Sequence, residues 1–234
     1  MNTEIQQSGS RDPDAVREMF GSIAWRYDWA NHLLSCGCDF FWRRRAATIV
    51  RSWNPNAIVD LATGTGDLAL SVKSALPNSE VIGVDFSEKM LAIAKSKGVS
   101  RTIVADALAL PFAERSFDCV TIAFGLRNIQ DWAAALAEMN RVLTRGGNLL
   151  IMEFSLPSMS ILRAVYRFYL HRIMPIFGAA LTQKKTAYDY LGDSIEQFPA
   201  GAAMLRLIES NGFRDAEVQP LTGGIVTIYT AAKS

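Results

Sequence analysis

The residues in this sequence that could do chemistry begin with a glycine-containing turn between two acids. The segment 60–67 reads Asp-Leu-Ala-Thr-Gly-Thr-Gly-Asp and follows the apolar run 57–59. That β-branched run predicts a strand, and the residues from Leu68 onward predict a helix, so the glycines lie in a strand-to-helix turn. Sheets built from such units bind nucleotide-containing ligands at this turn.

The charge of the turn favours one class of ligand. Gly64, Gly66 and Ala69 fit a G-x-G-x-x-[GA] dinucleotide fingerprint. A pyrophosphate would sit at the helix N-terminus, where the carboxylate of Asp67 repels it. S-adenosylmethionine carries a sulfonium and an ammonium in place of phosphates, and Asp60 and Asp67 can face that cationic end. The turn therefore predicts S-adenosylmethionine, with NAD and a purely structural turn as the alternatives.

Two further acids end predicted strands. Asp85 follows the run 81–84, and from there a carboxylate can accept hydrogen bonds from both ribose hydroxyls. The alternative is that Asp85 caps the helix that begins near Ser87. Asp106 ends the run 103–105 and could accept from an adenine amino group, unless it is only a solvated acid in a turn.

Composition indicates a globular protein that binds a small molecule. Half of the 234 residues are apolar, which suffices for a sizeable core. Lys and Arg total 24 against 23 for Asp and Glu, and this balance argues against nucleic acid as a partner. The first residues are polar and lack a signal-peptide core, and no stretch reaches the ~18 uncharged apolar residues of a membrane span. We therefore expect a cytoplasmic protein.

The cysteines give no strong sign of a metal site. Three cysteines, an odd number, favour reduced thiols, and Cys119 lies in an apolar run. His32, Cys36 and Cys38 together could suggest zinc, but no second cluster of ligands occurs in the sequence. We expect no bound metal.

Strands and helices alternate after an N-terminal segment. Residues 1–53 are expected to form a disordered lead-in and a helical extension, and residues 54–234 the main domain. The alternation predicts a parallel sheet with helices on both faces, and Gly146 and Gly147 are expected to stop the helix before the fifth strand. A glycine-containing link predicts that the last two strands form an antiparallel hairpin. The predicted strands are 57–61, 80–85, 101–105, 119–123, 148–153, 215–220 and 224–231.

A long insertion, 155–212, separates the fifth strand from the hairpin and must contain structure of its own. Its first half, 161–177, mixes aromatic and aliphatic residues with three arginines. Three interpretations stay open: a helical lid over the active site, a lid that also touches a membrane surface, and ordinary core. The charges exclude a membrane span.

Several segments beyond the turn carry a family resemblance. The most specific are Phe-Gly-Leu-Arg-Asn at 124–128 and Leu-Thr-Gly-Gly-Ile-Val at 221–226. Through them the chain resembles the ubiquinone and menaquinone biosynthesis C-methyltransferase family, most of all its members that act on demethylmenaquinone. The resemblance implies an α/β class I S-adenosylmethionine-dependent methyltransferase fold of Rossmann-like type, with five parallel strands plus a C-terminal antiparallel hairpin. Other matching segments are 27–31, 33–37, 60–67, 109–112, 138–143, 152–155 and 190–195.

The resemblance also implies cofactor contacts. The family's contacts fall on Thr65, Asp85 and the pair Asp106 and Ala107, in agreement with the turn and the strand-end acids. The predicted cofactor-binding residues are Asp60, Thr63, Gly64, Thr65, Gly66, Asp67, Asp85, Asp106, Ala107 and Ala123.

Three positions depart from the family pattern. Ala123 stands where many members have a serine that contacts the cofactor, so this contact is lost or is taken over by backbone. Ala62 and Thr63 replace glycines that are often seen in the family, which should tighten the turn.

The implied reaction is S-adenosylmethionine-dependent C-methylation of a prenylated quinol in menaquinone biosynthesis, which converts demethylmenaquinol to menaquinol. A quinol hydroxyl with a pKa of about 10 must lose or share its proton before the ortho carbon becomes nucleophilic. The benzoquinol of the ubiquinone pathway, a phytyl-naphthoquinol and the substrate of another small-molecule methyltransferase are the alternatives. From other classes, an NAD-dependent oxidoreductase and a non-catalytic binding module remain.

Arg127 and Asn128 follow the predicted fourth strand, and we assign them to orient the quinol oxygens and stabilise a phenolate. Tyr27 could supply a hydroxyl to the same oxygen. The structural alternatives are that Arg127 caps a helix or pairs with Asp131, and that Tyr27 is an ordinary core aromatic.

The prenylated naphthoquinol needs an apolar groove for its tail, and the insertion can line it. Because such a substrate resides in the bilayer, we expect peripheral docking at the inner membrane face, with arginines toward anionic lipid. A homodimer is left open. The expected groove residues are Tyr166, Phe168, Tyr169, Ile173, Ile176 and Phe177.

Overall fold

The structure is a computed structural model that describes residues 35, 37–176 and 185–234, with only the helical backbone described at 185–190. Its centre is a seven-stranded sheet in the order β3-β2-β1-β4-β5-β7-β6. The first five strands run parallel, whereas β7 is antiparallel to both β5 and β6, so the predicted fold is confirmed. The strands are β1 (Ala57–Leu61), β2 (Glu80–Asp85), β3 (Arg101–Val104), β4 (Phe117–Ala123), β5 (Leu143–Phe154), β6 (Phe213–Leu221) and β7 (Val226–Lys233).

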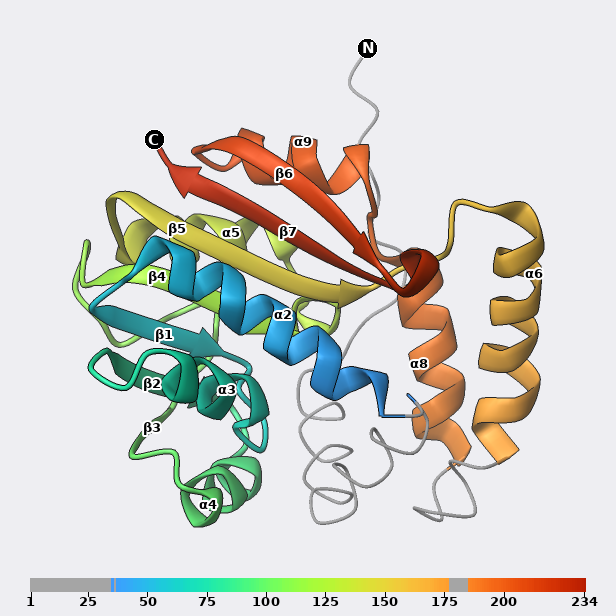
Figure 1. Cartoon of the computed structure of the whole chain (residues 1–234), viewed down its shortest axis with the longest axis horizontal. Helices are drawn as coiled ribbons and strands as arrows, with labels where there is room; N and C mark the ends of the chain where they lie inside the picture. The colour runs from blue at the N-terminus through green and yellow to red at the C-terminus, as the bar shows by residue number, and fades with distance from the viewer. Residues whose placement is uncertain (1–34, 36, 177–184) are drawn as a thin grey trace.

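The strand order creates one site at which a ligand can enter. The chain runs from β1 outward to β3 and then returns to place β4 on the other side of β1. In such sheets ligands bind outside the carboxyl ends of the strands, where the order reverses. The arrowheads of β1 and β5 point to the side on which α8 (Lys185–Gln197) and α6 (Ser160–Phe168) stand (Figure 1).

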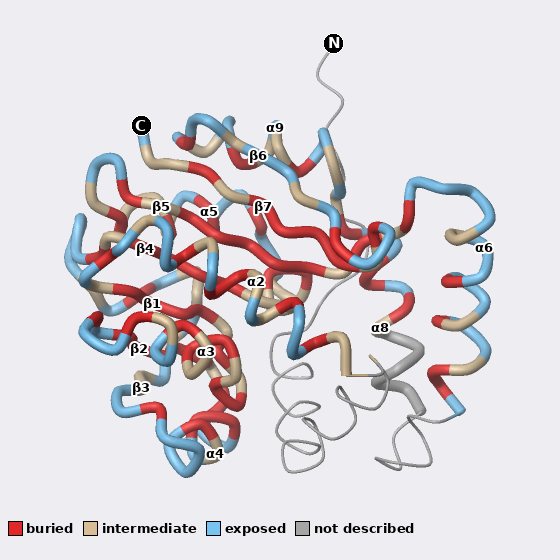
Figure 2. The backbone as a smooth tube through the Cα atoms, in the orientation of Figure 1, coloured by how far each residue is buried: buried red, intermediate tan, exposed pale blue. Residues whose placement is uncertain are grey.

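Helices cover both faces of the sheet and form two cores. One core joins α2 and α3 to one face, and the other joins α5 and α9 to the opposite face. The central strands β1, β4 and β5, with β2 and β7 beside them, contain the longest buried runs of the sheet, whereas the edge strands β3 and β6 are largely exposed (Figure 2). The remaining helices are α2 (Cys38–Trp53), α3 (Asp67–Ala75), α4 (Glu88–Lys97), η1 (Leu126–Asn128), α5 (Trp132–Val142), the π-helix η2 (Tyr169–Ile173), α9 (Ala202–Ser210) and η3 (Thr222–Gly224).

Helix α2 lies within the expected N-terminal extension, yet it packs onto the sheet. Trp42, Ala46 and Val50 are almost completely buried in the core that also contains α3. The Trp42 indole N–H donates to the Thr222 hydroxyl at 2.7 Å, which joins the start of α2 to the hairpin turn. The expected division at residue 53 stays a prediction, because residues 1–34 lie outside the described part.

The insertion divides into two parts with different roles. Helices α6, η2 and α8 share a small core of their own that packs against Phe154 and Ile225 at the carboxyl edge of the sheet. Helix α9 instead contacts β6 and α5 and helps to cover one sheet face. Only the part of the insertion before α9 is therefore placed to form the expected lid. The buried residues of the small core are Tyr166, Leu170, Met174 and Ile195.

The expected glycine stop before the fifth strand is wrong. Helix α5 ends at Val142, and Leu143 is already extended, with its N–H bonded to the Met139 carbonyl. Gly146 has a φ of 71° and lies inside an irregular start of β5. A Cβ at Gly147 would stand 2.9 Å from the Thr144 carbonyl oxygen, so the glycine permits a close backbone approach within the strand.

Candidate active site

The turn after β1 depends on three residues with left-handed backbone. Ala62, Gly64 and Gly66 have φ values of 47°, 56° and 87°. Within the turn the Thr63 N–H donates to the Val84 carbonyl at 2.9 Å, and the Gly66 N–H donates to the Thr63 carbonyl at 2.9 Å. The chain thereby reverses at the end of β2 and enters α3 directly at Gly66.

Two neighbouring glycines make room for the side chains that replace glycines in this turn. A Cβ at Gly125, just after β4, would lie 2.4 Å from the Ala62 Cβ. A Cβ at Gly83 in β2 would lie 2.9 Å from the Thr63 Cγ2. The turn is thus packed tightly between β2 and the segment after β4, and only glycine fits at both neighbouring positions.

Asp60 is a buried carboxylate at the end of β1. Only 1% of its surface is exposed, and it accepts hydrogen bonds from the Thr63 and Thr121 hydroxyls, both at 2.6 Å. Burial raises the pKa of Asp60 to about 6, although the two hydroxyls favour its charged form. The two hydroxyls donate hydrogen bonds to Asp60 but are themselves neutral. The negative charge of Asp60 can therefore still attract a cation.

Asp85 occupies the corresponding position at the end of β2. It is buried, its Oδ2 accepts from the Gly64 N–H at 2.8 Å, and its Oδ1 accepts from the Ser87 N–H at 2.9 Å. Burial raises the pKa of Asp85, whereas these backbone hydrogen bonds lower it. The cap of α4 is Ser87 itself, whose hydroxyl accepts from Met90. The alternative role of Asp85 as the helix cap is therefore wrong.

Asp67 was predicted to face a cationic ligand, but it lies between two cations of the chain. It forms ion pairs with Lys97 of α4 and with Arg43 of α2, the latter at 3.4 Å. These contacts balance the charge of Asp67, so the field of the turn comes mainly from Asp60 and Asp85. Thr65, which is buried, also accepts from Lys97 at 3.4 Å.

The remaining predicted cofactor residues lie at the same edge. Asp106 follows β3, is exposed, and accepts from the Leu108 N–H at 2.9 Å within a turn that includes Ala107. Ala123 is the last residue of β4 and is half-buried. The predicted contacts thus follow four neighbouring strands at their carboxyl ends.

The segment after β4 forms a strained turn. Phe124 has a φ of 56°, which is unusual for a bulky residue. Its carbonyl accepts from the Arg127 Nη1 at 2.5 Å and from the Asn128 side-chain amide at 3.4 Å. The centroid of the Phe124 ring lies 4.5 Å from that of the Phe154 ring and 6.1 Å from that of the Trp42 ring. Arg127 and Asn128 therefore fold back over the turn that carries them.

Arg127 forms a buried ion pair that the sequence did not predict. Its side chain is almost completely buried, its Nη1 lies 2.8 Å from the Glu153 Oε2, and its backbone N–H donates to the Glu153 Oε1 at 3.2 Å. The suggested pairing with Asp131 is wrong, because Asp131 caps α5 by accepting from Ala134 at 2.9 Å. Glu153 is the last residue of the predicted strand 148–153 and the last but one of β5, so it could have been noticed in the sequence as a fourth acid at a strand end.

Some predicted residues lie outside the described part, namely Tyr27, His32, Cys36 and Phe177. Cys38 and Cys119 are free thiols. In residues 35, 37–176 and 185–234 no group of three or more His, Cys, Asp or Glu side chains is arranged to hold a metal ion.

A Tyr-x-x-x-Lys spacing, which is typical of short-chain dehydrogenases, occurs at Tyr229 and Lys233. Both residues lie on β7, where Tyr229 is buried and accepts from the Gly201 N–H at 2.9 Å. Lys233 donates to the carbonyls of Asn140 and Leu143 at 2.6 and 2.8 Å. These hydrogen bonds to backbone groups hold both side chains in the packing around β7, so the spacing does not support an oxidoreductase.

Comparison with known proteins agrees with this geometry. The model of the ubiE/COQ5 methyltransferase family matches residues 6–233. The chain belongs to the ubiE/COQ5 methyltransferase family. It is therefore an S-adenosylmethionine-dependent methyltransferase, and the implied family is confirmed.

Individual relatives of this ubiE/COQ5 methyltransferase cover nearly its full length. A demethylmenaquinone methyltransferase from Thermus thermophilus is 46% identical and covers 90% of this chain and 98% of its own. A ubiquinone/menaquinone biosynthesis C-methyltransferase from Geotalea uraniireducens is 41% identical, with 94% and 97% covered. A solved S-adenosylmethionine-dependent methyltransferase from Thermotoga maritima shares the fold, with a TM-score of 0.66 at 18% identity over 93% of this chain and 99% of its own.

The substitution Asp60→Asn is expected to stabilise the ligand-free protein at pH 8. The pKa of Asp60 is raised from 3.8 to about 6 on folding, so above pH 6 the folded chain holds a buried charge that is solvated after unfolding. The shift of about two units corresponds to roughly 3 kcal/mol. Because asparagine makes weaker hydrogen bonds, we expect a net gain of about 1–2 kcal/mol in the free energy of unfolding.

Urea unfolding at pH 8 and pH 5 measures this effect. The stabilising contribution of protonated Asp60 is complete below pH 3.8 and is lost as the pH rises through about 6, so the advantage of asparagine must shrink on acidification. Asp131→Asn is the control, because this exposed cap keeps an acceptor oxygen. An advantage that is absent at pH 8, or that grows at pH 5, contradicts the assignment.

Proposed function

We propose that the chain transfers the methyl group of S-adenosylmethionine to a ring carbon of demethylmenaquinol and so forms menaquinol. The observation that carries the proposal is that the acidic turn after β1 and the Arg127 turn after β4 stand side by side, joined by the contact of Ala62 with Gly125. Relatives at 41–46% identity bear the name demethylmenaquinone methyltransferase. Others are named for both quinone pathways, so the benzoquinol precursor is the second candidate.

The residues of the first turn fit S-adenosylmethionine. This ligand supplies a methyl group that its sulfonium has already activated. Asp60 provides a buried negative field for the cationic end, and Asp85 lies where ribose hydroxyls are held in sheets of this kind. Thr65 and Gly64 line the turn between them. We assign the adenine end to Asp106 and Ala107, which follow the outer strand β3.

Arg127, Asn128 and Tyr27 act on the quinol side. A guanidinium has five N–H donors, so Arg127 can keep its pair with Glu153 and also face a quinol oxygen as charge develops there. Asn128 orients the second oxygen, and Tyr27 contributes a hydroxyl. A water held by Arg127 and Tyr27 accepts the proton, which leaves the ring carbon nucleophilic. The helices α6, η2 and α8 exclude bulk water at the edge of the sheet.

A methyl-transfer assay tests this function. Labelled S-adenosylmethionine is incubated with lipid extracts that contain demethylmenaquinone or the benzoquinol precursor, either oxidised or chemically reduced. We expect label only in the reduced naphthoquinol, and for Arg127→Lys a rate about a hundredfold lower with unchanged cofactor affinity. Arg101→Lys is the control, because Arg101 forms an exposed ion pair with Glu80 at the other end of the strands. Label in the quinone but not the quinol, or an unimpaired Arg127→Lys, contradicts the proposal.

The membrane surface is proposed as a second partner, through one face of α6 and its continuation. Ile161, Val165 and Phe168 are 75%, 61% and 61% exposed, and their spacing of four and three residues places them in one stripe. Arg172, which is exposed, and Ile176 continue that stripe. An apolar stripe with a cation fits the headgroup region of an anionic bilayer.

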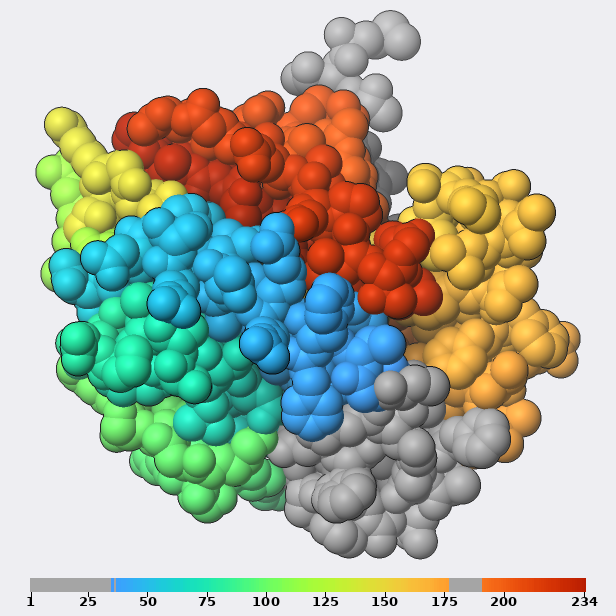
Figure 3. All heavy atoms as spheres, in the orientation of Figure 1, coloured from blue at the N-terminus to red at the C-terminus, as the bar shows by residue number. Residues whose placement is uncertain are grey.

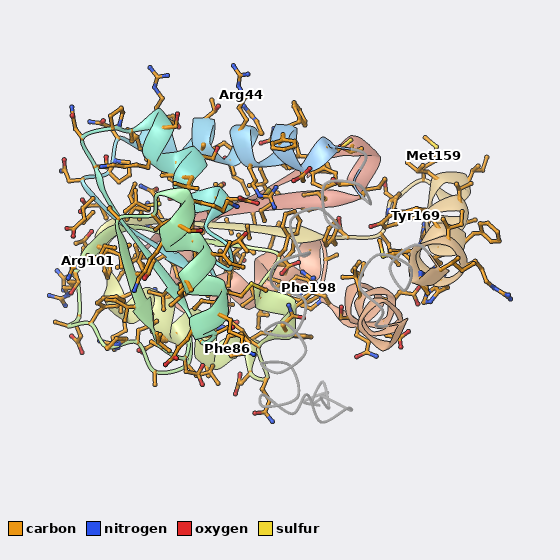
Figure 4. The ribbon with its side chains drawn as sticks, turned by 90° about the horizontal axis from the view of Figure 1, so that it is seen from below. Arg44, Phe86, Arg101, Met159, Tyr169 and Phe198 are labelled. Carbon is orange, nitrogen blue, oxygen red and sulfur yellow. The ribbon has the colours of Figure 1, made fainter. Side chains whose placement is uncertain are left out.

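The location of this stripe suits such a contact. The atoms of α6 form the outer margin of the face seen in Figure 3. Met159, which is also exposed, and Tyr169 mark the segment in Figure 4, at the opposite end of the molecule from Arg101. No helix of the described residues is both long and apolar enough to span a bilayer. A peripheral enzyme at the inner face of the membrane is thus the proposed location.

Vesicle sedimentation tests the docking. Phe168→Glu is expected to weaken binding to vesicles that contain phosphatidylglycerol by roughly tenfold or more, because an apolar side chain that enters the bilayer on docking is replaced by a charge that the anionic lipid repels. Val218→Glu is the matched control, since Val218 is 41% exposed but lies on β6. Equal binding of both variants and the wild type, or no binding of the wild type, contradicts the contact.

A further inference from the structure

Glu153 is a buried acid at the carboxyl edge of the sheet, and the proposed methyl transfer assigns it no role of its own. It lies at the end of β5, beside the end of β4, and 1% of its surface is exposed. Its Oε2 lies 2.8 Å from the Arg127 Nη1, and its Oε1 accepts from the Arg127 backbone N–H at 3.2 Å. Both carboxylate oxygens thus hold the same residue, one by its side chain and one by its backbone.

Through Arg127 the Glu153 carboxylate is also linked to the turn after β4. The same Nη1 donates to the carbonyl of Phe124, which has left-handed backbone. The guanidinium carbon lies 5.4 Å from the centre of the Phe154 ring, so the ring limits its movement on another side. A guanidinium held by two hydrogen bonds and a ring has little freedom of orientation, which is the condition for a preorganised catalytic donor.

We infer that Glu153 is a positioning residue for methyl transfer, which aims Arg127 at the quinol oxygen and balances its charge. The inference rests on the proposed function, because it requires that Arg127 meets a quinol. A quinol enters as a neutral molecule, and the ion pair offers it a strong donor in a site without net charge. Without the negative charge of Glu153, the uncompensated Arg127 cation would lower the pKa of the quinol hydroxyl. The guanidinium would also lose the hydrogen bond that fixes its direction.

Among the described residues, Tyr166 and Tyr229 are two titratable groups that act on this pair from neighbouring elements. Tyr166 of α6 interacts electrostatically with Arg127, and Tyr229 of β7 interacts with Glu153. Burial raises the pKa of both phenols, so both stay neutral through the pH range in which the enzyme would be assayed. A change in pH dependence on altering Glu153 is therefore assigned to the quinol rather than to these two phenols.

Single-turnover methyl transfer measured against pH tests the inference. Glu153→Gln is expected to lower the limiting rate roughly tenfold to a hundredfold, because Arg127 loses its fixed direction. The apparent pKa of the reaction should fall by about one unit, since an unbalanced cation favours the quinolate. The dissociation constant of S-adenosylmethionine should be unchanged. Glu153→Asp keeps the charge and should lower the rate without moving the apparent pKa.

Controls separate positioning from folding. Glu138→Gln breaks another ion pair, with Arg141 at 2.7 Å, and should alter stability without changing the apparent pKa of the reaction. A Glu153→Gln enzyme with wild-type rate and apparent pKa overturns the inference. Should that variant not fold, Glu153→Asp decides: a lower rate at the same apparent pKa supports positioning, and an unchanged rate overturns it. An inactive wild type would instead contradict the proposed function.

Discussion

The structure depends on the placement of buried carboxylates at the carboxyl edge of a parallel sheet. Asp85 is the last residue of β2, Asp60 and Glu153 are the last but one of β1 and β5, and each of the three is at most 5% exposed. A buried charge is expensive unless hydrogen bonds or an opposite charge compensate it. Here the compensation differs at each position: hydroxyls at Asp60, backbone N–H groups at Asp85, and a guanidinium at Glu153. This difference divides the edge into a side that attracts a cation and a side that presents a donor.

Tight backbone geometry makes this arrangement possible. The turn after β1 and the turn after β4 both contain left-handed residues that are not glycine, Ala62 and Phe124. Ala62 is accommodated because Gly125 has no side chain, and Phe124 is held by aromatic packing and by Arg127. Strain of this kind persists only where the surroundings fix it, and it gathers at functional sites. The two strained turns are the ones that we assign to the two substrates.

Much of the fold, and the position of several acids at the carboxyl edge of the sheet, could be predicted from the sequence. Alternating β-branched runs and amphipathic segments gave the parallel strands, and a short glycine-containing link gave the hairpin. The acids at 60 and 85 could be found because they directly follow apolar runs. Glu153 also ends such a run, but its partner Arg127 lies 26 residues earlier, and pairing over that distance depends on the neighbouring positions of β4 and β5.

Other features could not be read from local patterns. Gly146 and Gly147 are equally compatible with a helix stop and with an irregular strand. Only the pairing of Leu143 with Phe117 shows that the strand has already begun before them. The cations Arg43 and Lys97 that balance Asp67 come from two different helices. The π-helix η2 has no sequence signature of its own. In each case the outcome depends on tertiary contacts.

Calorimetric titration with S-adenosylmethionine near pH 6, in buffers of different ionisation enthalpy, tests the central claim most directly. If the buried carboxylate of Asp60 faces the cationic ligand, binding lowers its pKa from about 6, and about half a proton should be released per site at that pH. The release should disappear at pH 8 and in Asp60→Asn. Binding that releases no protons near pH 6, or that releases the same number in Asp60→Asn, would contradict the account.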